Sequence, residues 1–114
     1  FSPNSGVRYA YTESEMDAAS FFAQNSVETI SADWDYCDVL SCYYHCSRVR
    51  PLCNSLYKQN FLHDGAIKVI RKEIVNRPFR ISGGLYRLDY DPNTVLSNTG
   101  FNRIYDCSTV TGYL

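Results

Sequence analysis

Apolar residues near the start of the chain recur at the spacing of a helix. Four of them fall three or four positions apart on one face: Met16, Ala19, Phe22 and Ala23. Thr12 and Glu15 stand in the order of a capping box, in which each side chain accepts a hydrogen bond from the other residue's backbone. The pattern predicts a helix from Glu13 to Ala23 or Gln24.

A second helical pattern follows in the middle of the chain, at Val39, Cys42, Tyr43 and Cys46. It predicts a helix from Asp38 to about Val49, which Pro51 ends. Residues 25–37, "NSVETISADWDYC", are too sparse in apolar positions to separate a loop from a short edge strand. Residues 64–78 stay open as well, because their isoleucines suit a helix face while their β-branched content suits a strand.

The last third of the chain predicts short antiparallel strands. "FRIS" and "LYRLDYD" flank Gly83 and Gly84, which can take the positive φ angles of a hairpin turn. "DPNT" and "SNTG" have the composition of turns, and "FNRIY" and "TVTGYL" that of two further strands. Helices followed by antiparallel strands indicate an α+β fold. We expect one or two N-terminal helices packed on a small antiparallel sheet and stabilised by disulfides.

The composition excludes two classes of protein. The chain is 45% hydrophobic, which is too apolar for disorder, and no apolar run is long enough to span a membrane. Its 114 residues fit a single domain, 1–114, and we expect no membrane partner. Five cysteines, no initiator Met and no signal-like segment favour a secreted protein whose leader has been removed.

Four of the five cysteines lie in one short segment, "CDVLSCYYHCSRVRPLC", and the fifth is Cys107. We expect a long-range disulfide between Cys37 and Cys107, which would tie the sheet to the helical half. A second disulfide would join Cys53 to Cys42 or to Cys46. The remaining cysteine would stay unpaired or link two chains into a dimer.

The same segment offers ligand types suited to zinc, namely Cys42, His45, Cys46 and Cys53. Structural zinc usually takes its ligands as two short-spaced pairs from separate turns, whereas these residues form one run on a predicted helix. We therefore predict no metal site and no cofactor, and we interpret His45 as a polar surface residue.

Charge is unevenly distributed along the chain. Residues 1–45 carry seven acidic residues against one basic residue, and residues 46–88 carry nine basic against two acidic. The basic half also interleaves cations with aromatic residues, a combination that can bind phosphates and stack on bases. The alternative is that the two halves neutralise one another and that the aromatic residues form the core face of a sheet.

His63 and Asp64 stand next to each other, as in the catalytic dyad of secreted phospholipases. Those enzymes place the dyad in a helix flanked by cysteines, with a glycine-rich calcium loop, and neither feature stands near "NFLHDGAIK". The structural interpretation is a helix-capping Asp64 after an exposed His63.

Residues 83–114, "GGLYRLDYDPNTVLSNTGFNRIYDCSTVTGYL", resemble the closing strands of small microbial ribonucleases of the barnase and fungal guanyl-specific class. They are still more similar to ribonuclease-like secreted effectors of plant-pathogenic fungi. "YRLDYDP", "GFNRIY" and "DCSTVTGYL" match these effectors in order, and "WDYC" is similar to their early aromatic-x-Cys motif. The resemblance implies a role in virulence.

The resemblance also implies that catalysis is lost. The strand that carries the family's general base has Arg87 or Leu88 at that position, and the last strand ends without a general-acid His. At the position of the family's phosphate-binding Arg, this chain also has an arginine, Arg103. Losing both proton-transfer groups would lower the rate by several orders of magnitude.

The sequence therefore predicts a secreted, catalytically inactive, ribonuclease-like effector that binds a host protein or RNA. The expected contact residues are Arg103, Arg87 and Tyr86, surrounded by the cations Arg71, Lys72, Arg77 and Arg80. One alternative is a small hydrolase, either a ribonuclease using Glu73, His63 and Arg87 or a phospholipase-like enzyme using His63 and Asp64. The other is a disulfide-rich toxin or receptor ligand.

Overall fold

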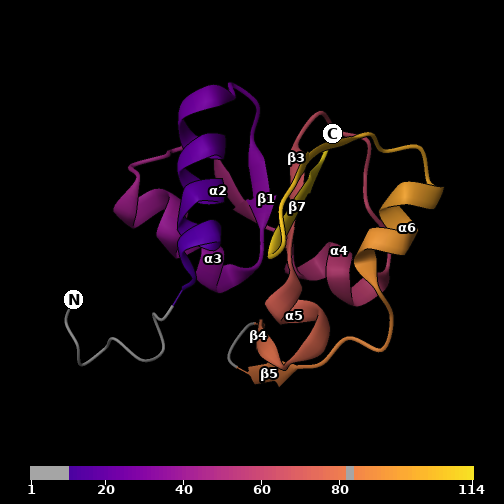
Figure 1. Cartoon of the computed structure of the whole chain (residues 1–114). Helices are drawn as coiled ribbons and strands as arrows, with labels where there is room; N and C mark the ends of the chain where they lie inside the picture. The colour runs from indigo at the N-terminus through magenta and orange to yellow at the C-terminus, as the bar shows by residue number, and fades with distance from the viewer. Residues whose placement is uncertain (1–10, 82–83) are drawn as a thin grey trace.

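The computed structural model describes residues 11–81 and 84–114. A five-stranded sheet runs through the middle of the molecule in the order β2-β1-β3-β7-β6, and helices lie on both of its faces (Figure 1). The strands of this sheet are β1 (Ile30–Ala32), β2 (Val49–Pro51), β3 (Ile67–Arg71), β6 (Arg103–Asp106) and β7 (Val110–Tyr113). The helices are α2 (Glu13–Asn25), α3 (Trp34–Asp38), α4 (Cys53–Lys58), α5 (Lys72–Asn76) and α6 (Pro92–Asn98).

The sheet is mixed, which corrects the expected antiparallel sheet. β2, β1 and β3 run parallel, while β7 pairs antiparallel with β3 and with β6. A parallel pair needs a crossover connection, and between β1 and β2 this is α3 with the π-helical turn η1 (Val39–Tyr43). Helices therefore alternate with strands along the chain and are not confined to its N-terminal part.

The first predicted helix is confirmed as α2. The side chain of Thr12 accepts a hydrogen bond from the Glu15 backbone, and the Glu15 carboxylate accepts one from the Thr12 backbone, so the capping box is complete. Phe22 lies fully buried on the inner face of this helix. Gly112 makes room for it, since a Cβ at that position would lie 2.6 Å from the Phe22 ring.

The predicted helix from Asp38 to Val49 is wrong at both ends. The helix starts at Trp34, because the carboxylate of Asp33 caps it by accepting a hydrogen bond from the Tyr36 N–H. The helical path ends before His45, whose φ of 56° lies in the left-handed region. Val49 then belongs to β2, where it pairs with Ile30.

The two ambiguous stretches are mixtures of strand and helix. Within residues 64–78 the chain forms β3 and then α5, so a strand pattern is followed by a helix pattern.

The predicted "DPNT" turn is instead the start of α6, with Asp91 as the N-cap and Pro92 in the first turn. The predicted hairpin is formed by β4 (Phe79–Ile81) and β5 (Gly84–Tyr86) as a separate two-stranded sheet. Gly83 itself lies outside the described residues.

The sheet separates two apolar clusters. On the face covered by α2 and α3, buried side chains from those helices pack on Ile67 and Val69 of β3. On the opposite face, Ile70 of the same strand packs with residues of α4, α5 and α6. All five side chains of β3 are buried, as expected for a strand covered on both faces. Among the described residues, no helix is long and apolar enough to cross a membrane.

Candidate RNA-binding site

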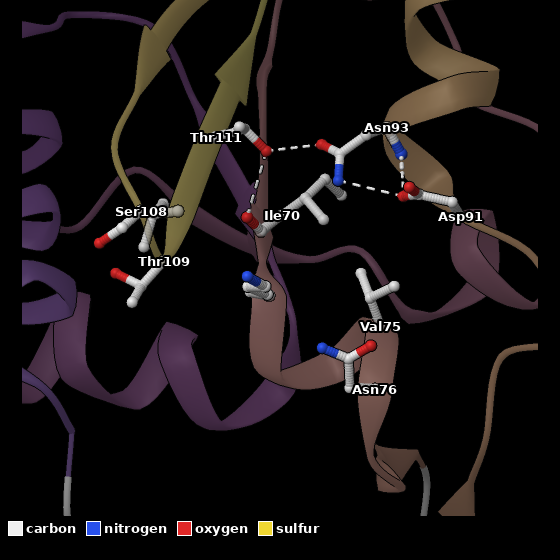
Figure 2. Close-up of a pocket in the computed structure, with 10 residues that line it drawn as sticks. Ile70, Val75, Asn76, Asp91, Asn93, Ser108, Thr109 and Thr111 are labelled. Carbon is white, nitrogen blue, oxygen red and sulfur yellow. Dashed lines mark hydrogen bonds between the residues drawn. The ribbon is translucent and has the colours of Figure 1, made fainter.

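A pocket of about 270 Å³ lies at the carboxyl end of β3. It is enclosed by α5, by the start of α6 and by the β6–β7 turn with the adjoining part of β7 (Figure 2). Seven polar residues in the described part of the chain line it: Lys72, Asn76, Asp91, Asn93, Ser108, Thr109 and Thr111. Ligands of α/β proteins commonly bind at the carboxyl ends of the parallel strands, so both the position and the polar lining indicate a binding site.

Asn93 is held in one orientation inside this pocket. Its Oδ1 accepts hydrogen bonds from Thr111 Oγ1 at 2.6 Å and from the Tyr113 hydroxyl at 2.8 Å. Its Nδ2 donates to Asp91 Oδ1 at 3.1 Å (Figure 2). An amide nitrogen carries two N–H groups, so the second one remains for a ligand. The Asp91 carboxylate beside it supplies acceptor oxygens.

Lys72 lines the pocket, Arg87 bonds to the pocket residue Asn76, and Arg77 follows Asn76 in the chain; we call these three cations the basic rim. Lys72 lines the pocket itself, is exposed and forms no ion pair with any described residue. Arg87 donates from Nη2 to the backbone oxygen of Asn76, a pocket residue, at 3.3 Å. Arg77 is exposed, and its Nη1 lies 4.0 Å from Glu73 Oε2. Solvent strongly screens an exposed ion pair of this kind.

An aromatic pair lies next to the basic rim along the chain. Tyr86, the residue before Arg87, is half-buried and contacts the Tyr57 ring at a centroid distance of 5.1 Å. Phe79 supports Tyr86 from its strand partner position, with the rings edge to face. Tyr57 is 59% exposed, so a ring face is available for stacking with an unpaired base.

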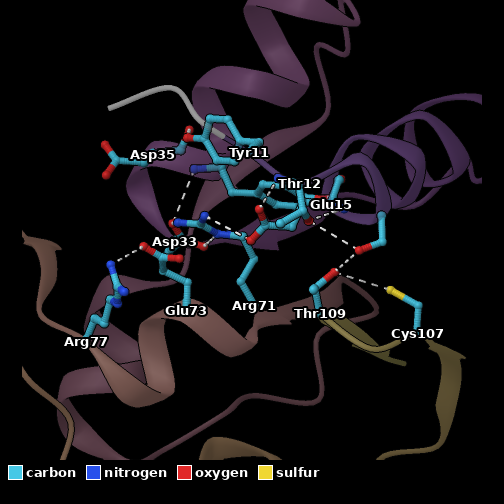
Figure 3. Close-up of polar contacts among 12 residues, drawn as sticks. Tyr11, Thr12, Glu15, Asp33, Asp35, Arg71, Glu73, Arg77, Cys107 and Thr109 are labelled. Atoms are coloured by element: carbon cyan, nitrogen blue, oxygen red, sulfur yellow. Dashed lines mark hydrogen bonds and ion pairs between the residues drawn. The ribbon is translucent and has the colours of Figure 1, made fainter. Parts of the chain in front are cut away.

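Arg71, expected among the surface cations, is instead buried in an ion cluster with Asp33 and Glu15 (Figure 3). Its Nε and Nη2 donate to the two oxygens of Asp33 at 3.0 and 2.7 Å, and Nη1 lies 3.4 Å from Glu15 Oε2. The cause is its place at the end of β3, where its side chain turns toward α2. Arg71 is therefore removed from the predicted RNA-contacting set.

Two tyrosine rings cover the guanidinium of Arg71. The rings of Tyr11 and Tyr36 lie 5.2 and 5.4 Å from its central carbon, at a distance typical of cation–π contacts. Burial raises the pKa of both tyrosines well above 10, so both hydroxyls stay protonated. Burial alone would lower the pKa of Arg71, but the Asp33 charge and its hydrogen bonds outweigh this and raise it.

Thr109 joins the ion cluster to the pocket. Thr109 lines the pocket, and its Oγ1 forms a hydrogen bond of 2.6 Å with Ser14 in α2 (Figure 3). Its backbone oxygen accepts from the N–H of Lys72 at 2.8 Å. The pocket wall is thus fixed to the same helix that supplies Glu15.

The two other predicted cations are Arg103 and Arg80. Arg103 is in the edge strand β6, where it pairs with Asp106 at 3.2 Å. Its guanidinium carbon lies 5.7 Å from the ring of its strand partner Tyr113, and its side chain is hydrogen-bonded to that tyrosine. The Tyr113 hydroxyl donates to Asn93, so Arg103 is connected to the pocket through one tyrosine although it does not line it. The side chain of Arg80 is outside the described residues.

His63 and Asp64 have separate partners. The His63 ring stacks on Phe101 at 3.9 Å, and its Nε2 lies 2.9 Å from the Thr99 backbone oxygen. Asp64 receives hydrogen bonds from the buried Lys68 and from Arg50. Glu73 follows β3 while His63 precedes it, and a five-residue strand spans about 16 Å, so these two groups are not placed to act together.

No disulfide joins the cysteines, all five of which lie in the described part of the chain. Cys42 is exposed and Cys46 is buried. Cys107 lies in the β6–β7 turn, with its sulfur 3.7 Å from Thr109 Oγ1. The cysteine pairing expected from the sequence therefore stays a prediction.

Sequence reasoning missed the amides and hydroxyls of the pocket and the buried ion cluster. Two signals were available. Asp33 and Arg71 each come directly at the end of an apolar run, "TISAD" and "AIKVIR", as polar residues at the carboxyl ends of parallel strands do. In "DPN", Asp91 followed by Pro92 is an N-cap and first-turn pattern that marks a helix start.

Comparisons with protein-family models, with curated proteins and with solved structures give no match to this chain.

Replacing Arg71 by Met should strongly destabilise the fold. The substitution leaves Asp33 and Glu15 buried without their cation, which typically costs about 3–5 kcal/mol. Urea unfolding measures the loss. Arg77→Met, at an exposed pair, is the matched control and should change stability by about 0.5 kcal/mol or less. Equal effects of the two substitutions would contradict a stabilising role for the cluster.

The stability contributed by Asp64 should disappear in acid. The Lys68 hydrogen bond holds the pKa of Asp64 at about 2, below the value of about 3.9 for an unfolded chain. A lowered pKa stabilises the folded state above pH 4, and this contribution is lost as the pH falls toward 2.

Urea midpoints of the natural chain and of Asp64→Asn should therefore differ at pH 6 and converge near pH 2. Asp106→Asn, at the exposed Arg103 pair, provides the control and should show little convergence. A gap between the natural chain and Asp64→Asn that stays constant from pH 6 to pH 2 would contradict the assignment.

Proposed function

We propose that this chain is a non-catalytic RNA-binding domain that binds single-stranded RNA at the pocket and its basic rim. The observation that carries the proposal is that Lys72 lines a pocket of amides and hydroxyls and that Arg87 bonds to Asn76 in the wall of this pocket. The basic rim binds the phosphates, and the pocket binds the sugar or base of one nucleotide.

The basic rim suits a phosphate chain because its charges are available. Lys72 has no ion-pair partner among the described residues, and the Arg77 pair with Glu73 is long and exposed. Cations in this state bind phosphates by releasing counterions, which makes the affinity fall as salt rises. Asp91 adds a negative charge on the far side of the pocket, so the phosphates belong to the rim and not to the pocket itself.

The pocket offers groups that recognise a sugar or a base. Asn93 has an N–H directed away from Thr111 and Tyr113, and Asp91 offers carboxylate oxygens. A ribose hydroxyl both donates and accepts hydrogen bonds, so it can accept one from Asn93 and donate one to Asp91. The neighbouring Tyr57–Tyr86 pair gives a stacking surface for the next base.

A binding role fits the available groups better than catalysis. Among the described residues, the two histidines of the chain do not contact the pocket: His63 is held by Phe101 and Thr99, and His45 follows η1. Acid–base cleavage of RNA needs two groups that exchange protons with the substrate. The described lining of the pocket has one carboxylate, Asp91, and no histidine.

The sequence supports the biological setting of the proposal. The resemblance of residues 83–114 to ribonuclease-like effectors of plant-pathogenic fungi and the cysteine content favour a secreted effector that acts in a host. In that setting, the RNA belongs to the host. A host protein is the alternative partner, and it becomes the leading one if RNA does not bind.

Fluorescence anisotropy with a labelled single-stranded RNA tests the site. Binding should weaken as salt rises, and Lys72→Gln, Arg77→Gln and Arg87→Gln should each weaken it. Each lost phosphate contact should reduce the slope of log affinity against log salt by about 0.7. The triple substitution should lower affinity at least about tenfold. Thermal melting of each variant confirms that it is folded.

Arg50→Gln is the matched control because Arg50 is exposed, lies in β2 at the opposite edge of the sheet from β6 and does not line the pocket. It removes one exposed Arg and should leave RNA affinity unchanged. Affinity that is lost in Arg103→Gln but kept in the triple variant would move the site to β6, as the ribonuclease resemblance implies. RNA binding that is absent, or insensitive to salt, would overturn the proposal.

A further inference from the structure

Two cysteines approach the carboxyl end of β1 from different helices. Cys37 is the fourth residue of α3, which follows β1, and Cys53 is the first residue of α4, which follows β2. β1 and β2 are parallel neighbours in register, with Ala32 beside Pro51. Both helices therefore start at the same edge of the sheet.

Hydrogen bonds place both sulfurs on one short stretch of backbone. The Cys37 thiol lies 3.3 Å from the oxygen of Ala32, and that oxygen also accepts the N–H of Leu52, the residue before Cys53, at 2.8 Å. The Cys53 sulfur is hydrogen-bonded to the backbone of Trp34. A helix side chain points back toward the helix start, so Cys37 in α3 is directed at the turn that Cys53 touches.

We propose that Cys37 and Cys53 form a disulfide when the protein meets an oxidised thiol such as glutathione disulfide. The bond joins α3 to α4 across the β1–β2 pair. This proposal is independent of RNA binding, and it replaces the Cys37–Cys107 pairing expected from the sequence.

The position of Cys107 argues against the longer-range bond. The Cys37 sulfur lies 3.5 Å from the Arg50 oxygen, so it sits on the side of β1 that faces β2. Cys107 is in the β6–β7 turn, and β3 comes between β1 and β7. Two strand intervals amount to about 10 Å, whereas a disulfide requires Cα atoms within about 7 Å.

The reaction is an ordinary thiol–disulfide exchange. The Cys37 thiolate attacks one sulfur of glutathione disulfide, which forms a mixed disulfide and releases one glutathione thiolate. The Cys53 thiolate then attacks the Cys37 sulfur and releases the second glutathione. Two protein thiols lose two electrons, and the glutathione disulfide gains these electrons and the two protons.

The surroundings predict a slow reaction at neutral pH. Burial, followed by the charge of Asp33, raises the pKa of Cys37 to about 12, and burial also raises the pKa of Cys53. Only the thiolate reacts, so the rate should rise about tenfold per pH unit between pH 7 and pH 9. The exposed Cys42 should be modified first, but it should keep glutathione as a mixed disulfide.

Peptide mapping of the oxidised, alkylated full chain identifies the bond. Trypsin separates residues 49–58, which contain Cys53, from residues 9–48, which contain Cys37, and from residues 104–114, which contain Cys107. We expect peptide 49–58 to be linked to peptide 9–48, and Cys107 to be free to react with the alkylating agent. A link from 9–48 to 104–114, or full alkylation of Cys53, would overturn the proposal.

Matched serine variants distinguish the cysteines within residues 9–48. Cys42→Ser and Cys46→Ser should keep the linked peptides, and Cys37→Ser should lose them. A link that survives in Cys37→Ser would overturn the assignment. Because Cys37 is only half-buried, its substitution should leave the fold intact, which a melting curve checks.

The single tryptophan gives a second readout. Trp34 is 45% exposed and its backbone contacts the Cys53 sulfur, so a disulfide there should quench its fluorescence. Oxidation should lower the tryptophan emission of the natural chain and of Cys107→Ser, and reduction of the disulfide should restore it. Equal quenching in Cys37→Ser would contradict the proposal.

Discussion

The bidentate pairing of Arg71 with Asp33 is the interaction on which the rest of the structure depends. It joins the end of β3 to the residue that follows β1, and Glu15 adds α2 to the same contact. Buried charges of this kind are stable only together, because each alone would be costly to remove from water. The arrangement fixes the carboxyl edge of the sheet. Lys72, the next residue, therefore enters the pocket from a rigid starting point.

The parts of the fold that could be predicted depend on local signals. The α2 helix carries its own capping box, and Phe79 and Tyr86 flank a glycine turn, so neighbouring residues determine both. The mixed sheet could not be predicted in this way, because β1 pairs with β2 and β3 through contacts between distant segments. The start of α3 also differs from the prediction, because the apolar spacing begins only at Val39 while the cap, Asp33, lies in a segment with few apolar residues.

Only part of the candidate site could be predicted from the sequence. Lys72, Arg77, Arg87 and Tyr86 stand out by residue type, but Arg71 and Arg103 have the same type, and only burial and position separate them from the others. Asn93 gives no signal at all. Its role depends on Thr111 and Tyr113, which orient its amide from a strand that follows it in the chain.

The place of β7 inside the sheet has a consequence for the order of folding. β7 lies between β3 and β6, although it is the last strand in the sequence. β6 and β7 can form a local hairpin quickly, whereas pairing β7 with β3 must close a long loop, which is slow. Until that step, the edge of β3 opposite β1 stays unpaired. The β3–β7 pair is therefore expected to form late in folding. A chain that stops before this step would expose the edge of β3, which is prone to pairing with a neighbouring molecule.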